Sequence, residues 1–353
     1  MSEFTSIVSQ EKTLSIMLTY TCPAECKDCG TLSSPRSREN ITLDEAKKFI
    51  SEAKDSGDFS VVVFTGGEAT LRWKDLLLAI KFAKERGLST RLVTNAHWAV
   101  RENIAREKLT DLIDAGLDEI NYSTGDEHVR FIPLDRVALA SRLALDLQLS
   151  LCVMIESKAN RAVTCETLLS HREFAGVSRD KLDNMSIIES PWMPLDPMTV
   201  ESYNDGLAAT FDNIDVQRPC HVVLSTYTVQ SDGRVGACCG LGMRQIDELN
   251  IGRVNDRLDD IRSRAESDLI LLAIRYLGPF YLLKWAASED SSIKWEGMYA
   301  HQCQACARLY KDASVKQFLF AHVNELRERV MAAATFDESI GHRYKSLFTQ
   351  SFV

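Results

Sequence analysis

Three cysteines fall within eight positions near the start of the chain. They are Cys22, Cys26 and Cys29 in the segment "TYTCPAECKDCG", spaced C-x3-C-x2-C. Three thiolates on one loop can hold three irons of a cubane [4Fe–4S] cluster and leave the fourth iron open to an exogenous ligand. Structural zinc takes four closed ligands, and no further Cys or His occurs before residue 97. The spacing favours a cluster, with a remotely completed zinc site or incidental thiols as alternatives.

Ten cysteines occur in the whole chain, and five of them lie beyond residue 219. The first 21 residues hold no basic start followed by an apolar core, so no signal peptide is predicted. Without secretion, clustered cysteines are typical of metal binding or catalysis rather than of disulfides. We therefore expect a cytoplasmic, reducing setting.

Charge and hydropathy argue against two classes of partner. The formal net charge is −9, which disfavours a broad basic face for nucleic acid. The most apolar run, residues 268–287, contains Arg275, Gly278, Pro279 and Lys284. We therefore expect no membrane span and predict a buried or amphipathic helix that is broken at Gly278-Pro279.

The elements that must position the cysteine loop follow a repeated pattern. Between residues 13 and 190, short apolar runs typical of strands alternate with amphipathic helical segments. The predicted strands are 13–20, 59–67, 89–96, 117–124, 149–157 and 183–190. Such alternation indicates parallel strands with right-handed crossovers. Six units are too few for a closed eightfold barrel, so the predicted fold class is α/β, an open, partial (β/α)6 barrel.

Unusual residues gather where these predicted strands end, which is the edge that carries the chemistry in such folds. The cysteine loop follows the first strand, and Gly66-Gly67-Glu68 follows the second. Asn95 ends the third strand. The later strand ends supply Ser123, Asp126, Glu156 and Glu189, and His97 and His128 lie near the same edge. Either histidine can contact substrate or move a proton, the alternative being a packing role.

At this point the chain resembles the radical S-adenosylmethionine (SAM) superfamily. The resemblance rests on "CPAECKDC" after the first strand and "FTGGEATL" after the second, and it covers residues 13–190. It implies that Cys22, Cys26 and Cys29 ligate a [4Fe–4S] cluster whose open iron chelates SAM. It also implies reductive cleavage of SAM to a 5′-deoxyadenosyl radical, which abstracts a hydrogen atom from the substrate.

The same resemblance implies a SAM site made of Gly66, Gly67, Glu68, Asn95, Ser123 and Asp126. Glu68 offers an acceptor to the SAM ammonium, and the two glycines allow close backbone approach. Plain polar capping of strand ends is the alternative for Asn95, Ser123 and Asp126. One departure is Asp28, which stands before the third cysteine where the family usually has an aromatic residue.

A second resemblance concerns the C-terminal part. "CHVVLSTYTVQSDGRVGACCG" reads as a hairpin turning at Ser-Asp-Gly, and it is followed by "CQAC". This layout resembles the SPASM/twitch extension of radical SAM enzymes, a small cysteine-rich α+β domain. It implies one auxiliary [4Fe–4S] cluster on Cys220, Cys238, Cys303 and Cys306, with tetrahedral zinc as the alternative.

Cys239 is the one cysteine beyond residue 219 that this set of four ligands does not include. Adjacent strand residues point to opposite sides, so we expect Cys239 to face away from the ligands. Some enzymes of the family return a hydrogen atom from a free thiol, which makes Cys239 a catalytic candidate, the alternative being a small buried residue.

The expected domains are the radical SAM barrel at 13–190, the SPASM/twitch-like domain at 215–325 and a helical tail at 326–353. The resemblance implies a peptide substrate made on the ribosome, altered by a crosslink, a thioether or epimerisation. A small-molecule substrate such as a sugar or nucleotide is the first alternative, and a non-catalytic iron–sulfur or zinc scaffold is the second. An electron donor such as flavodoxin or ferredoxin is expected.

Overall fold

The computed structural model describes residues 11–204, 206–214 and 219–349. Its strands form one nine-stranded sheet with the order β6-β5-β4-β3-β2-β1-β7-β8-β9. The strands are β1 (Lys12–Met17), β2 (Phe59–Thr65), β3 (Ser89–Thr94), β4 (Glu119–Gly125), β5 (Ser150–Ser157), β6 (Met185–Pro191), β7 (Thr226–Val229), β8 (Arg234–Gly236) and β9 (Asn250–Arg253).

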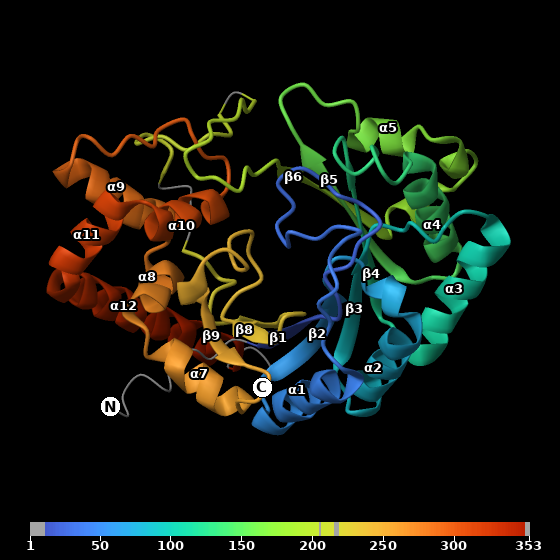
Figure 1. Cartoon of the computed structure of the whole chain (residues 1–353), viewed down its shortest axis with the longest axis horizontal. Helices are drawn as coiled ribbons and strands as arrows, with labels where there is room; N and C mark the ends of the chain where they lie inside the picture. The colour runs from blue at the N-terminus through green and yellow to red at the C-terminus, as the bar shows by residue number, and fades with distance from the viewer. Residues whose placement is uncertain (1–10, 205, 215–218, 350–353) are drawn as a thin grey trace.

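Strands β1 to β6 pair in parallel, each with the next along the chain. The helices between them are α1 (Leu43–Ser56), α2 (Trp73–Glu85), α3 (Glu102–Ala115), α4 (Leu134–Asp146), α5 (Cys165–Leu169) and α6 (Arg179–Leu182), with 3-10 turns η1 (Ala69–Arg72) and η2 (Arg172–Phe174). Helices α1 to α4 cover the outer face of the sheet (Figure 1). The predicted α/β partial barrel is confirmed.

Local sequence explains how the first helix is placed. Thr42 and Glu45 form a reciprocal capping box at the start of α1, and Gly57 ends the helix with φ of 81°. Its buried side chains Phe49 and Ile50 pack on the outward-facing residues of the sheet, such as Val62. Because strands β1 to β6 run in parallel, the loops that follow their carboxyl ends gather at one edge of the sheet.

The C-terminal extension continues the barrel sheet. The predicted hairpin is present as antiparallel β7 and β8, with Gly233 at φ of 81° in the turn. Strand β7 also pairs in parallel with β1, which the sequence analysis did not foresee. Two buried hydrogen bonds reinforce this junction: Tyr20 to Gln230 at 3.0 Å, and Ser231 to the Met17 carbonyl at 2.8 Å. The sheet is therefore unbroken between the expected domains.

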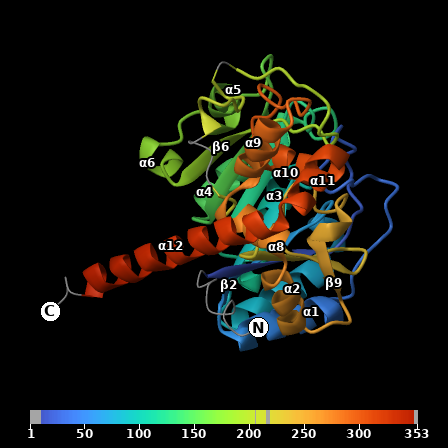
Figure 2. The same cartoon turned by 90° about the vertical axis from the view of Figure 1, so that its left-hand side faces the viewer.

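Helices dominate the rest of the extension. They are α7 (Leu258–Glu266), α8 (Leu269–Tyr276), α9 (Pro279–Glu289), α10 (Gln302–Lys311), α11 (Ala313–Ala321) and α12 (Val323–Thr349), with the turn η4 (Asp247–Leu249). The predicted break at Gly278-Pro279 separates α8 from α9, and Gly278 has φ of 89°. Figure 2 shows α12, the predicted tail, projecting from the body of the molecule.

In the described part of the chain, no single helix is long and apolar enough to span a membrane. Helices α8 and α9 together meet that criterion by length and composition only, and they are bent by 103°.

Candidate functional site

The cysteine loop is seated on the turn that follows β2. Gly67 donates its N–H to the Thr19 carbonyl at 2.7 Å, and Glu68 donates its N–H to the Thr21 carbonyl at 2.9 Å. A Cβ on Gly66 would lie 2.4 Å from the Thr19 oxygen, and one on Gly67 would lie 2.5 Å from the Thr21 oxygen. Both positions need glycine because the backbone that leads into Cys22 runs directly against them.

A cavity of about 240 Å³ opens beside this turn. Its walls include Cys22, Cys26, Cys29, Gly66, Gly67, Asn95, Ser123, His128 and Trp192. Burial raises the pKa of the Cys22 and Cys26 thiols to about 12 each. A metal binds the thiolate form of cysteine, so metal binding at these residues releases protons. Three soft sulfur donors around a cavity match the donor set of an iron–sulfur cluster.

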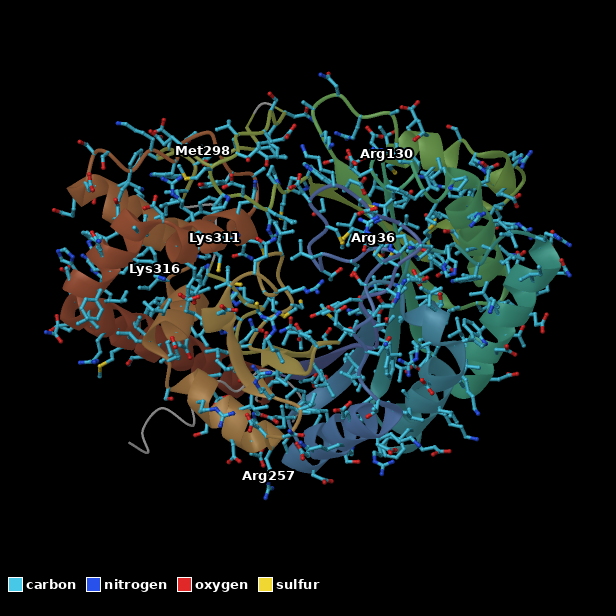
Figure 3. All side chains as sticks on the ribbon, viewed as in Figure 1. Arg36, Arg130, Arg257, Met298, Lys311 and Lys316 are labelled. Atoms are coloured by element: carbon cyan, nitrogen blue, oxygen red, sulfur yellow. The ribbon has the colours of Figure 1, made fainter. Side chains whose placement is uncertain are left out.

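The extension closes over this loop. Arg244 donates to the Thr31 carbonyl at 2.6 Å, and the Gly30 backbone approaches Leu241 so closely that a Cβ would lie 3.0 Å from its side chain. Figure 3 labels Arg36 in the barrel part and Lys311 on α10 of the extension. The cysteine loop therefore lies between the two parts of the molecule.

Glu68 is directed into the fold. Its side chain is 1% exposed and does not line the cavity. One carboxylate oxygen accepts from the Thr70 N–H at 3.2 Å and from the hydroxyls of Thr70 and Thr94 at 2.6 and 2.8 Å. The other oxygen accepts from the Asn95 N–H at 2.8 Å. With these four hydrogen bonds, the carboxylate joins the ends of β2 and β3. Its contact with the SAM ammonium stays a prediction.

Asn95 lies between the cavity and the end of β3. Its side-chain amide donates to the Cys22 sulfur at 3.5 Å, and its side-chain oxygen accepts from the His97 N–H at 3.0 Å. The ring of His97 does not line the cavity, and its Nδ1 has no partner among the described residues. Burial lowers the pKa of His97 below its ordinary value, so the ring is neutral at pH 7.

His128 lines the cavity and is held from behind by Glu156. The Glu156 carboxylate accepts from the Glu127 N–H at 2.6 Å and also contacts Nδ1 of His128. Asp126, in contrast, accepts from the backbone N–H of Ala162 and of Val163 and does not line the cavity. Of the two histidines, the structure therefore brings His128 to the cavity with the thiols.

Five thiols from three separate segments converge on a second cavity of about 380 Å³. Its walls include Cys220, Cys238, Cys239, Cys303, Cys306, His301, Met154, Ser190 and Met193. Burial raises the pKa of Cys303 to about 12 and also raises those of Cys238 and Cys306. Cys238 is buried whereas Cys239 is exposed, and both border the same cavity.

Among the described residues, no three His, Cys, Asp or Glu side chains stand close enough to hold one metal ion. Tetrahedral zinc with Zn–S bonds of about 2.3 Å needs sulfurs about 3.8 Å apart. In a cubane, each thiolate binds a different iron, so its thiolates stand farther apart. A zinc ion and a cluster therefore differ in the spacing of the thiolates that they require.

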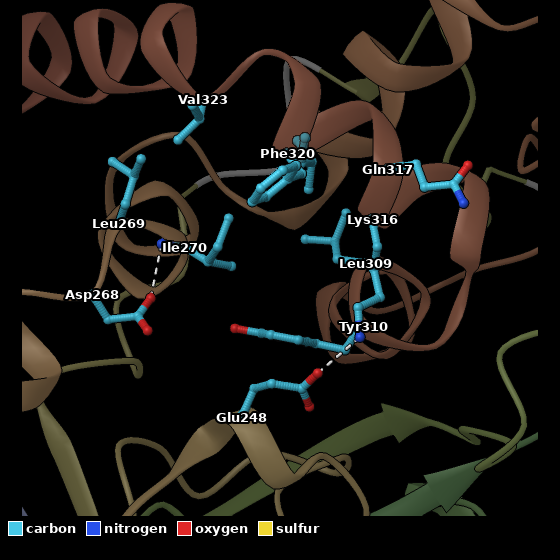
Figure 4. A pocket seen from close by; sticks show the side chains of 11 residues that line it. Glu248, Asp268, Leu269, Ile270, Leu309, Tyr310, Lys316, Gln317, Phe320 and Val323 are labelled. Carbon is cyan, nitrogen blue, oxygen red and sulfur yellow. Dashed lines mark hydrogen bonds and ion pairs between the residues drawn. The ribbon is translucent and has the colours of Figure 1, made fainter.

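A third cavity of about 590 Å³ lies among α8, α10 and α11 (Figure 4). Apolar side chains such as Leu269 and Phe320 line it, and an ion pair of 2.9 Å joins Glu248 to Lys316 at its edge. It contains none of the predicted site residues.

Trp192 and His301 are two residues of these sites that were not predicted from the sequence. Trp192 follows β6 and lines the first cavity, and His301 caps α10 by accepting the Cys303 N–H at 3.1 Å. A signal existed for Trp192, because an aromatic residue directly after the sixth strand falls on the same sheet edge as the cysteine loop.

Comparison with known proteins gives matches over different parts of the chain. Residues 16–125 match the model of the Radical SAM superfamily. YydG of Bacillus subtilis (strain 168), which its name assigns to peptide biosynthesis, is 21% identical over 326 residues, covering 89% of this chain and 97% of that protein. The PqqA peptide cyclase of Bradyrhizobium diazoefficiens is 39% identical over 107 residues, covering 30% of this chain and 26% of the cyclase.

Among solved structures, native anSMEcpe with bound AdoMet and Cp18Cys peptide has a similar fold. The TM-score is 0.54 with 14% sequence identity, and the alignment covers 91% of this chain and 99% of that one. The family match covers both the cysteine loop and the glycine turn that seats it. Residues 16–125, which contain both the cysteine loop and the glycine turn, therefore match the Radical SAM superfamily.

Proposed function

We propose that this enzyme binds SAM at a [4Fe–4S] cluster held by Cys22, Cys26 and Cys29 and abstracts a hydrogen atom from a peptide made on the ribosome. The observation that carries the proposal is that all three thiols line one cavity with Gly66 and Gly67. A cluster held by these three thiols would supply one electron for the reductive cleavage of SAM to methionine and a 5′-deoxyadenosyl radical.

The protein's part is to bind, orient and exclude water. The Gly66-Gly67 turn lines the cavity, and its backbone carbonyls are the proposed acceptors for the SAM ammonium. Asn95 holds the first thiol by a hydrogen bond. Ser123 and His128 close the side of the cavity toward β4 and β5. Glu156 fixes the ring of His128, which leaves Nε2 as the nitrogen for contact with substrate or SAM.

A peptide substrate is supported by the relatives and by one surface. YydG is named for peptide biosynthesis, and PqqA peptide cyclase for a peptide. Met154 of β5 and Ile188 of β6 pair across the strands and are 45% and 49% exposed. Met154 also borders the second thiol cavity, and β6 is an edge strand of the sheet. An extended peptide can bind such an edge through main-chain hydrogen bonds, with apolar side chains on the exposed pair.

We further assign the second cavity to an auxiliary [4Fe–4S] cluster on Cys220, Cys238, Cys303 and Cys306. The convergence of these four thiols on one cavity supports this assignment, with zinc as the alternative. Cys239, exposed on the same cavity, remains as a free thiol that can give a hydrogen atom to a substrate radical. Flavodoxin or ferredoxin is the proposed electron source.

The test is anaerobic reconstitution followed by reduction with dithionite in the presence of SAM. We expect release of 5′-deoxyadenosine, and no release from the variant with Ala at Cys22, Cys26 and Cys29. A short peptide encoded beside the gene is then added as substrate, and mass spectrometry is expected to show its modification. Cleavage by the triple variant would overturn the cluster assignment. Turnover of a sugar or nucleotide, with the peptide unchanged, would overturn the peptide assignment only.

A further inference from the structure

One short segment of the extension reaches both thiol cavities. Residues 240–244, named the bridge segment here, run from the second cavity to the cysteine loop. At one end, Gly240 lies so close to the second cavity that a Cβ on it would be 3.2 Å from the Cys303 sulfur. At the other end, Arg244 contacts the backbone that follows the three thiols of the cysteine loop.

Leu241 contacts a residue of each site. Burial raises the pKa of the Cys303 thiol to about 12, while a hydrogen bond from the Leu241 backbone acts in the opposite direction. The Leu241 side chain packs against Gly30, where a Cβ would lie 3.0 Å from its Cδ1 atom. Gly30 directly follows Cys29, the third thiol of the cysteine loop. One residue of the bridge segment therefore joins a thiol of the second cavity to the loop of the first.

Arg244 holds the cysteine loop from the other end of the bridge segment. Its guanidinium donates to the Thr31 carbonyl at 2.6 Å and to the Leu32 carbonyl at 2.8 Å. The guanidinium also lies 3.6 Å from the centre of the Tyr20 ring, and Glu39 pairs with it at 3.7 Å. Hydrogen bonds from a charged donor are stronger than those between neutral groups. This side chain, which is only 15% exposed, therefore fixes the C-terminal side of the cysteine loop.

The small strands of the extension hold the bridge segment in place. Asn250, at the start of β9, donates its side-chain amide to the Met243 carbonyl at 3.1 Å and to the Ile246 carbonyl at 3.0 Å. Arg234 of β8 donates to the Arg244 carbonyl at 3.2 Å. Because its backbone is tied to the sheet of the extension, Arg244 passes the position of the extension on to the cysteine loop.

We propose that Arg244 is a positioning residue that couples the two sites, a role that rests on the proposed function. Metal bound by the thiols of the second cavity restrains the adjoining end of the bridge segment, and Arg244 thereby keeps the cysteine loop closed around the first cluster. The coupling concerns how long the first cluster stays bound. It leaves SAM cleavage itself unchanged, since Arg244 does not line the first cavity.

Alkylation of the metal-free protein with iodoacetamide, followed by mass spectrometry of Cys29, tests the contact without a cluster. Arg244→Ala removes the hydrogen bonds to Thr31 and Leu32 and is expected to speed labelling about tenfold, the factor that corresponds to about 1.4 kcal/mol. Arg244→Lys keeps a cation that can donate to one carbonyl and is expected to label at an intermediate rate. Arg257→Ala, at an arginine of the extension whose side chain is 74% exposed, is the matched control with unchanged labelling. Equal labelling of Cys29 in wild type and Arg244→Ala would overturn the proposal.

The coupling is measured in reconstituted protein as the rate at which an iron chelator abolishes the EPR signal that responds to SAM, since SAM binds at the first cluster. We expect a loss about tenfold faster in Arg244→Ala, and also a faster loss in the variant with Ala at Cys303 and Cys306. The triple variant is expected to be no faster than the faster of the two, because both changes act through the bridge segment.

Rates that multiply in the triple variant would overturn the coupling, as would a wild-type rate in the variant without Cys303 and Cys306. A wild-type protein with no signal that responds to SAM would instead contradict the proposed function, whereas the labelling of Cys29 does not depend on it.

Discussion

The side-chain amide of Asn95 donates to the sulfur of Cys22 at 3.5 Å, which joins the end of β3 to the first thiol of the cysteine loop. Hydrogen bonds to cluster sulfurs stabilise the reduced, more negative state. We therefore expect Asn95→Ala to retain its iron and to shift the potential of the cluster to more negative values. A redox titration followed by EPR measures the shift.

Asn121→Ala is the matched control, since Asn121 lies on β4 and does not line the cavity. An unchanged potential in Asn95→Ala would show that the contact with Cys22 does not persist once the thiol binds iron.

The two thiol cavities predict the metal content. Anaerobic reconstitution is expected to give about eight iron and eight sulfide per chain, as two cubanes require. Cys303→Ala combined with Cys306→Ala is expected to lower the count to about four and to leave SAM cleavage at the first cluster intact. Metal analysis measures both. Cys239→Ala, at the exposed thiol of the same cavity, is the control and is expected to keep about eight iron per chain. About four iron and one zinc per chain in the wild type would refute the auxiliary cluster.

Glu68 gives a prediction about stability. Glu68→Gln replaces one of two acceptor oxygens by an N–H₂ group, which then faces donors from Thr94, Thr70 or Asn95. A buried donor without an acceptor costs about 1–3 kcal/mol in the free energy of unfolding. We expect a lowered melting temperature and unchanged iron content.

Glu107→Gln, at an exposed position on α3, is the matched control without this cost. SAM affinity is measured in parallel. If Glu68→Gln melts like wild type but binds SAM roughly ten- to a hundredfold more weakly, the carboxylate contacts the SAM ammonium instead.

The pH dependence of stability follows from His97. Burial lowers the pKa of His97 in the folded chain below about 6.5, its value in the unfolded chain. Below pH 6.5 the unfolded chain binds a proton at His97 that the folded chain does not bind. The stability that comes from burying the neutral ring is therefore present above pH 6.5 and is lost as the pH falls. His97→Gln is expected to lessen the loss between pH 6.5 and 5, by at most about 1.4 kcal/mol per pH unit.

Denaturant unfolding at both pH values measures the difference. An equal loss of stability in wild type and His97→Gln would contradict a neutral, buried ring.

Much of the fold could be predicted because it depends on local sequence. Alternating apolar strands and amphipathic helices identified six parallel strands, and Ser-Asp-Gly identified the β7–β8 hairpin. Gly278-Pro279 marked the break between α8 and α9, because glycine and proline act on their own backbone. The cysteine spacing and the glycine pair likewise identified the loop and the turn, since both lie within short segments.

Long-range contacts decided the rest. The pairing of β7 with β1 joins residues more than 200 positions apart, and no local pattern encodes it. The same holds for the second cavity, where Cys220, Cys238 and Cys303 meet from three segments. Strand-end position alone could not tell His128, whose ring lines the first cavity, from His97, whose ring does not.

Side-chain direction was decided by which partners the fold supplies. Glu68 stands in a motif that suggested a ligand contact, yet four donors from the ends of β2 and β3 hold its carboxylate inside the fold. Trp192 belongs to no motif, yet its position after the edge strand brings it to the cavity with an unpaired N–H. The sequence by itself determined which loops meet at the sheet edge, because strand direction is local. Only the tertiary structure decided which side chains face the cavity, because buried polar groups turn toward whichever partners satisfy their hydrogen bonds.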